Sequence, residues 1–240
     1  MKRVIGNSVM MNISKRKNEN TTALRVVQTK DNDPELIREL VNSTIHGFGI
    51  LFGITALPFL SSLAIKNPNG DYLPAIFMYG FSFLMVFTFS TIYHAFQHST
   101  IKKVFEILDH ISIYFLIAGT YTPLILTYMN NANGMVMLWL LWGLVLVGTI
   151  FKIYFGCRYN ILSTVVYLLM GWMILWTGGE FFRTMPPGVI KLVLGGGFLY
   201  TAGVIFFLWE KLKWHHAVWH FLALAGAVCH FLAIYKSMLL

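Results

Sequence analysis

Seven long apolar segments constrain the fold of this chain more than any other feature. Each is close to the ~20 residues that cross ~30 Å of hydrocarbon. They cover residues 43–64, 75–96, 107–128, 135–153, 161–178, 189–209 and 215–236. Backbone polar groups in a bilayer must be satisfied internally, and these segments lack the alternation typical of barrel strands. The sequence therefore predicts an all-α integral membrane protein, a bundle of seven transmembrane helices.

Composition supports the same class. Of 240 residues, 57% are hydrophobic and 12% are charged, which is too apolar for a soluble domain of this length. The net charge of +8 does not indicate a nucleic-acid partner, because the basic residues gather in the polar tail and the connections. Cys157 and Cys229 lie too far apart along the predicted bundle for a disulfide bond. We expect a multi-pass protein of the cell (plasma) membrane whose partner is membrane lipid, with no nucleic acid and with the oligomeric state left open.

The chain divides into a polar N-terminal tail, residues 1–38, and a seven-transmembrane domain, residues 39–240. The tail is too hydrophilic for a cleaved signal peptide, and a short amphipathic helix is expected near Pro34. Fourteen of the eighteen Lys and Arg residues fall in the tail and in the second, fourth and sixth connections, with Lys152 counted in the fourth. The positive-inside rule therefore predicts a cytoplasmic N-terminus and a C-terminus outside.

The last apolar segment begins with an HxxxH pair, His216 and His220. On a helix these residues share one face, with Cβ atoms roughly 6 Å apart. The predicted topology brings Ser90, His94 and Asp109 to the same cytoplasmic-side layer. Ionisable side chains are costly inside a membrane, so they are functional candidates there.

Three neutral imidazoles and an open fourth position are typical of a hydrolytic zinc centre. Zinc lowers the pKa of bound water to about 7, and a carboxylate outside the ligand set could take the released proton. We therefore predict that His94, His216 and His220 bind Zn²⁺. Asp109 is the candidate base, and Ser90 is the candidate hydrogen-bond partner of a carbonyl oxygen or a ligand.

Each of these residues also has a structural interpretation. Asp109 could cap the third helix and complement its dipole, and Ser90 could donate a hydrogen bond to its own helix. His230 lies roughly 21 Å along the helix from His216, so we expect a histidine with its hydrogen bonds made inside the bundle rather than a ligand.

The motifs together resemble those of the hemolysin III proteins, the bacterial branch of the progestin and adipoQ receptor family, which includes the adiponectin receptors. The matching motifs are ExxNxxxH at Glu39, Asn42 and His46, SxxxH at Ser90 and His94, LDH at residues 108–110, GGGFLYTAGVIFF, HHAVWH and GAVCHF. The resemblance covers about residues 35 to 236. One departure is Ile45, where relatives usually have Thr.

The resemblance implies a seven-helix bundle with a cytoplasmic N-terminus. It also implies zinc bound by three histidines, which map onto His94, His216 and His220. The family aspartate that holds the zinc-bound water maps onto Asp109, and the family serine maps onto Ser90. The ExxNxxxH motif is expected to have a structural or pocket-lining role.

Two functions follow from these observations. The first is a zinc-dependent hydrolase that acts on a lipid amide or ester, ceramide-like, at the cytoplasmic side. The alternative is a non-enzymatic hemolysin III-type protein, a cytolysin or a regulator of membrane lipid state, with a structural or sensory zinc. A retinal photoreceptor is disfavoured, because the only lysine near the end of the seventh segment is Lys236.

Overall fold

The computed structural model describes residues 34–67, 72–177 and 179–240, and every regular element in these ranges is a helix. The elements are α2 (Pro34–Lys66), α3 (Leu73–Ala95), α4 (Ser99–Tyr128), α5 (Ala132–Phe155), α6 (Asn160–Gly171), the 3₁₀ helix η1 (Met173–Thr177), α7 (Glu180–Thr184), α8 (Pro187–Leu208) and α9 (His215–Met238). Within these ranges, seven spans are long and apolar enough to cross a membrane, α6 and η1 together forming one of them. The predicted all-α, seven-helix membrane fold is confirmed.

The first span begins earlier than its apolar core. A helix starts at Pro34, as expected, but it is not a short separate helix, because it continues without a break to Lys66. The chain divides into two units between Glu39 and Leu40, and the bundle described below belongs to the second. Residues 1–33 of the predicted tail lie outside the described residues.

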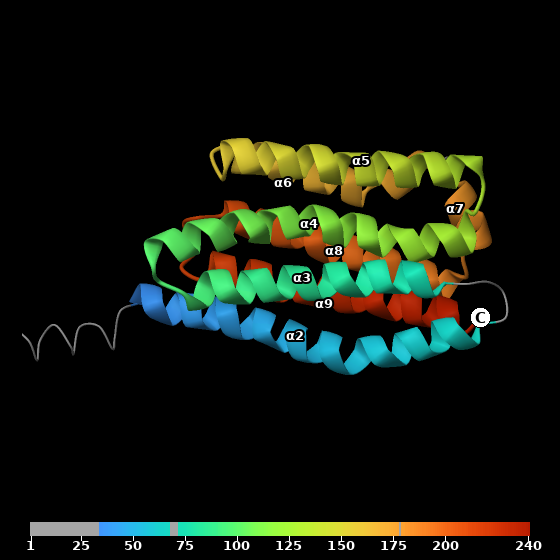
Figure 1. Ribbon diagram of the computed structural model, residues 1–240, viewed down its shortest axis with the longest axis horizontal. Helices are drawn as coiled ribbons and strands as arrows, with labels where there is room; N and C mark the ends of the chain where they lie inside the picture. Colours follow the sequence, from blue (N-terminus) through green and yellow to red (C-terminus); the bar gives the residue numbers. More distant parts are fainter. Residues whose placement is uncertain (1–33, 68–71, 178) are drawn as a thin grey trace, which may run out of the picture. The chain divides into compact units, whose positions relative to one another are not determined.

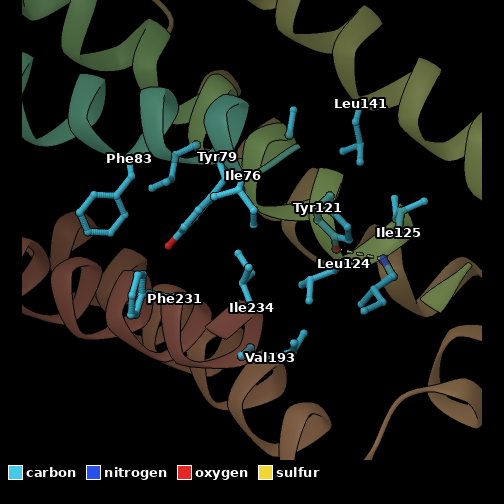
Figure 2. Close-up of a cluster of buried hydrophobic side chains, with 14 of the residues drawn as sticks. Ile76, Tyr79, Phe83, Tyr121, Leu124, Ile125, Leu141, Val193, Phe231 and Ile234 are labelled. Carbon is cyan, nitrogen blue, oxygen red and sulfur yellow. Dashed lines mark hydrogen bonds between the residues drawn. The ribbon is translucent and has the colours of Figure 1, made fainter. Parts of the chain in front are cut away.

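Helix α4 occupies the middle of the bundle formed by the second unit (Figure 1). Of its apolar window 67% is buried, against 28% for α5 and α8. Helix α3 packs along one side of α4 and α5 along another, while α8 pairs with α9. Side chains of α3, α4, α8 and α9 meet in the apolar core shown in Figure 2, to which α5 adds Leu141. The bundle thus surrounds its third span, which carries Asp109.

Helix α2 packs against α3 and α9 through small residues. The Phe52 ring lies 5.9 Å from that of Phe83 on α3 and 5.0 Å from that of Phe231 on α9. Gly49 and Gly53 form a GxxxG pair, and a Cβ atom at Gly49 would overlap the Phe87 ring. Small residues at this spacing allow close approach between membrane helices, so α2 places its buried face near the start of α9.

The fifth span is not one continuous α-helix, as the uniform apolar segment 161–178 had suggested. Helix α6 ends at Gly171, and η1 begins at Met173. The Tyr121 hydroxyl donates to the Gly171 carbonyl (2.6 Å) and accepts from the Ile174 amide (3.1 Å). Backbone groups released at a break inside the bilayer need such partners, so Tyr121 stabilises the joint.

We expect Tyr121→Phe to destabilise the protein by about 1–3 kcal/mol, because it leaves buried backbone groups without a partner. Unfolding of detergent-purified protein measures this effect. Tyr154→Phe is the matched control, since Tyr154 is 81% exposed and should show no change. Equal stability of Tyr121→Phe and wild type would contradict the role assigned to the hydroxyl.

Candidate metal centre

Three histidines from two helices converge at the end of the bundle where α3 ends and α9 begins. His94 lies in the last turn of α3, and His216 and His220 lie in the first two turns of α9. One ring nitrogen from each lies within 4.8 Å of the other two. His94 and His220 are each 2% exposed, and their Nε2 atoms are 2.9 Å apart. The structure therefore brings together the three histidines that the sequence singled out.

This donor set fits a metal ion. Imidazole nitrogens suit zinc and other transition metals. Tetrahedral zinc with Zn–N distances of 2.0–2.1 Å separates its nitrogen ligands by roughly 3.3 Å. The three nitrogens lie within 4.8 Å of one another. The rings cross at steep angles instead of stacking, 82° for His94 with His220 and 87° for His216 with His220. The cluster could hold a metal ion with small side-chain movements.

Asp109 lies well inside α4, ten residues after its first residue, Ser99. It therefore cannot cap this helix, and the capping interpretation is wrong. The sequence stretch before Asp109 is polar enough to look like a connection, but it is helical. Asp109 lines the same cavity as His216 and His220, a position from which its carboxylate could serve chemistry at the cluster.

Ser90 lies one turn before His94 and is fully buried. Its Oγ lies next to the Asp109 carboxylate, yet it has no hydrogen-bond partner of good geometry among the described residues. The interpretation that Ser90 bonds its own helix is therefore wrong. Its neighbour Thr91 does so, donating to the Phe87 carbonyl. The hydroxyl of Ser90 thus remains available at the site.

A cavity of about 240 Å³ extends from the histidine cluster into the bundle. Along α4 its lining runs from Glu106 to Leu124, which spans roughly 27 Å of helix. Beyond the polar end its walls include Ile113, Ile117 and Val193. The cavity is therefore elongated and largely apolar, with the candidate metal centre at one end.

His230 lines this cavity far from the cluster. Its Nε2 donates to the Val193 carbonyl of α8 (3.1 Å), and a Cβ atom at Gly196 would overlap its ring. His230 therefore has a hydrogen bond inside the bundle, as expected, and it is not one of the three converging histidines.

The family model described as Haemolysin-III related matches residues 35–231. The chain belongs to the hemolysin III family. Hemolysin-3 of Bacillus cereus is 39% identical over 196 residues, covering 82% of this chain and 90% of that protein. The Hemolysin-3 homolog of Bacillus subtilis (strain 168) is 37% identical over 196 residues, covering 82% and 92%. The human Monocyte to macrophage differentiation factor is 28% identical over 211 residues, covering 85% and 86%.

Family membership and the seven apolar spans identify a multi-pass protein of the cell membrane. The family match spans all five residues of the candidate site, from Ser90 to His220. It also contains the ExxNxxxH motif of α2, of which His46 proves to lie beside the cluster, with its ring centroid 4.1 Å from that of His220. Sequence spacing gave no reason to pair these two residues, and only the motif pointed to His46.

The position of Lys152 also differs from the one predicted from the sequence. It was counted as a charge of the fourth connection, but it lies in the last turn of α5 and is fully buried. Its Nζ donates to Asn160 Oδ1 at the start of α6 (2.9 Å). Asn160 in turn lines the cavity, so this hydrogen bond joins a residue of the cavity wall to α5.

We expect purified hemolysin III family protein to carry about one metal ion per chain. Substitution of any of the three converging histidines by Ala should remove the ion, because two imidazoles alone hold a metal weakly. His230→Ala should retain it and serves as the control. Elemental analysis after purification without chelators measures the content, and a metal-free wild type would contradict the assignment.

Proposed function

We propose that this protein is a zinc-dependent hydrolase of a lipid amide or ester, ceramide-like, acting at the cytoplasmic side of the membrane. One observation carries the proposal: Asp109 and two histidines of the cluster line the polar end of an elongated apolar cavity. Lipid amides and esters combine an apolar chain with a polar scissile group, and this cavity offers a place for each.

Zinc, when bound by His94, His216 and His220, lowers the pKa of water to about 7 and polarises a carbonyl group. Asp109 accepts the proton of the attacking water and returns it to the leaving amine or alcohol. The Ser90 hydroxyl donates a hydrogen bond to the scissile carbonyl oxygen or holds the Asp109 carboxylate in place. Products are a carboxylic acid and an amine or alcohol, so the proton taken from water is the one delivered to the leaving group.

The apolar walls of the cavity support a lipid as the substrate. Ile113, Ile117 and Val193 provide surfaces that an acyl chain would cover, and they exclude bulk water from the chain. The wall adds Tyr200 and Trp219, side chains with an apolar ring and a polar tip. Binding energy along the chain would place the carbonyl group beside the histidine cluster.

Asp109→Asn should lower turnover roughly 10²–10⁴-fold, the usual contribution of a positioned acid–base group, while metal content stays unchanged. The assay presents detergent-purified or nanodisc-embedded protein with a panel of lipid amides and esters that includes ceramides. Asn133→Ala, at the opposite end of the bundle on α5, is the control and should retain activity. A metal-loaded wild type that cleaves no member of the panel would contradict the hydrolase.

A second candidate function comes from the names of the relatives, Hemolysin-3 and its homolog. A membrane-lysing protein should release dye from sealed liposomes, and His94→Ala should release as much dye as wild type if lysis needs no metal. Release by wild type without lipid turnover would favour this alternative over the hydrolase. We expect no release, because the cavity inside the bundle is lined mainly by apolar residues.

A further inference from the structure

Four buried polar atoms beside the histidine cluster have no hydrogen-bond partner among the described residues. They are Asn42 Oδ1, both ring nitrogens of His46, and His220 Nδ1. They make up half of the eight such atoms in the described part of the chain. Exposure is 5% for Asn42, 4% for His46 and 2% for His220. Buried polar groups are normally paired, so this concentration requires an explanation.

The three side chains are neighbours in space. Asn42 and His46 are four residues apart on α2, so they lie on one face of that helix. The His46 and His220 ring centroids are 4.1 Å apart, with the rings at 76°. His46 is not among the histidines whose nitrogens converge. It therefore contacts a candidate metal ligand without being one.

The donors and acceptors of these atoms match in one arrangement. When His220 Nε2 gives its lone pair to a metal ion, Nδ1 carries the proton and becomes a donor. A neutral imidazole at His46 has one acceptor nitrogen and one donor N–H, and Asn42 Oδ1 can only accept. A chain from His220 Nδ1–H to His46, and from the His46 N–H to Asn42 Oδ1, satisfies all four atoms.

We propose that His46 and Asn42 form a hydrogen-bond relay that orients the metal ligand His220 and increases its basicity. The proposal rests on the metal centre of the proposed function, and it does not depend on hydrolysis. In the structure, His220 Nε2 instead contacts His94 Nε2 at 2.9 Å. A bound metal ion would accept the lone pairs of both Nε2 atoms and replace this contact. The relay therefore belongs to the metal-loaded state.

Both relay members are positioning residues. A histidine that ligates a metal almost always donates its other N–H to an acceptor, and loss of that acceptor typically weakens metal binding about 10–100-fold. No ring nitrogen of His94 or His216 is among the buried unpaired atoms of the described residues. His220 is therefore the ligand whose orientation depends on α2.

The experiment measures zinc affinity of detergent-purified full-length protein by competition with a chromogenic chelator. The variants are His46→Leu, His46→Gln, Asn42→Ala and the His46→Leu/Asn42→Ala pair, each checked by thermal unfolding. The Gln side chain keeps both an acceptor and a donor, so His46→Gln should retain most of the zinc affinity that His46→Leu loses. Phe52→Leu is the packing control, because it alters the contact of α2 with α3 and α9 without a polar atom.

We expect His46→Leu to bind zinc about 10–100-fold more weakly while still reaching the wild-type stoichiometry at saturation. Asn42→Ala should cause a smaller loss of zinc affinity in the wild-type background. It should cause no further loss in the His46→Leu background, because Asn42 acts on His220 only through His46. Zinc X-ray absorption should show three imidazole ligands in both wild type and His46→Leu.

Unchanged affinity in His46→Leu, additive losses in the double variant, or an equal loss in Phe52→Leu would overturn the relay and leave the metal centre standing. Two imidazoles at zinc in His46→Leu would also overturn it, because His46 would then be a direct ligand. A wild type that binds no zinc would overturn the relay and the metal centre together. Absence of lipid turnover with normal zinc binding would count only against the hydrolase.

Discussion

Polar groups inside this bundle must find their partners within the protein, because the bilayer interior offers no water. Most of the structure follows this constraint. Hydroxyl groups such as those of Ser82 and Thr120 donate to carbonyls of their own helices, and the Tyr121 hydroxyl joins both sides of the α6–η1 break. Five of the eight buried atoms that remain unpaired in the described part of the chain belong to Asn42, His46, Ser90 and His220. Buried polar atoms without hydrogen-bond partners are thus concentrated where the three imidazoles converge.

The packing of α2, α3 and α9 creates this concentration. Glycines of α2 admit rings from α3, and the His46 ring of α2 packs against that of Phe87, with centroids 5.1 Å apart. The same compactness that excludes solvent also brings His94 within hydrogen-bond distance of His220. A site built this way has little freedom to rearrange, since each ring is confined by a helix that also packs the core.

Much of the fold was predictable from the sequence, because each span is an apolar run near the length that crosses a bilayer. Convergence of His94 with His216 and His220 was also predictable, since topology places the end of α3 and the start of α9 at the same depth. Hydropathy could not show that α4 begins at Ser99, because its first turns are polar, and this error produced the capping interpretation of Asp109. Nor could it reveal the proximity of His46 to His220, which depends on how α2 packs against α3 and α9.

Lys152 has a consequence for how the protein enters the membrane. Its ammonium group is fully buried at the end of α5, and its hydrogen-bond acceptor, Asn160, is the first residue of α6. Only residues 156–159 separate these helices, so the two spans form a hairpin in which the ammonium group lies beside its neutral amide acceptor. Helix α5 alone would lack this acceptor, and the lysine side chain would have to reach the membrane interface instead. We therefore expect the fourth and fifth spans to insert together, as a hairpin whose two arms share this hydrogen bond.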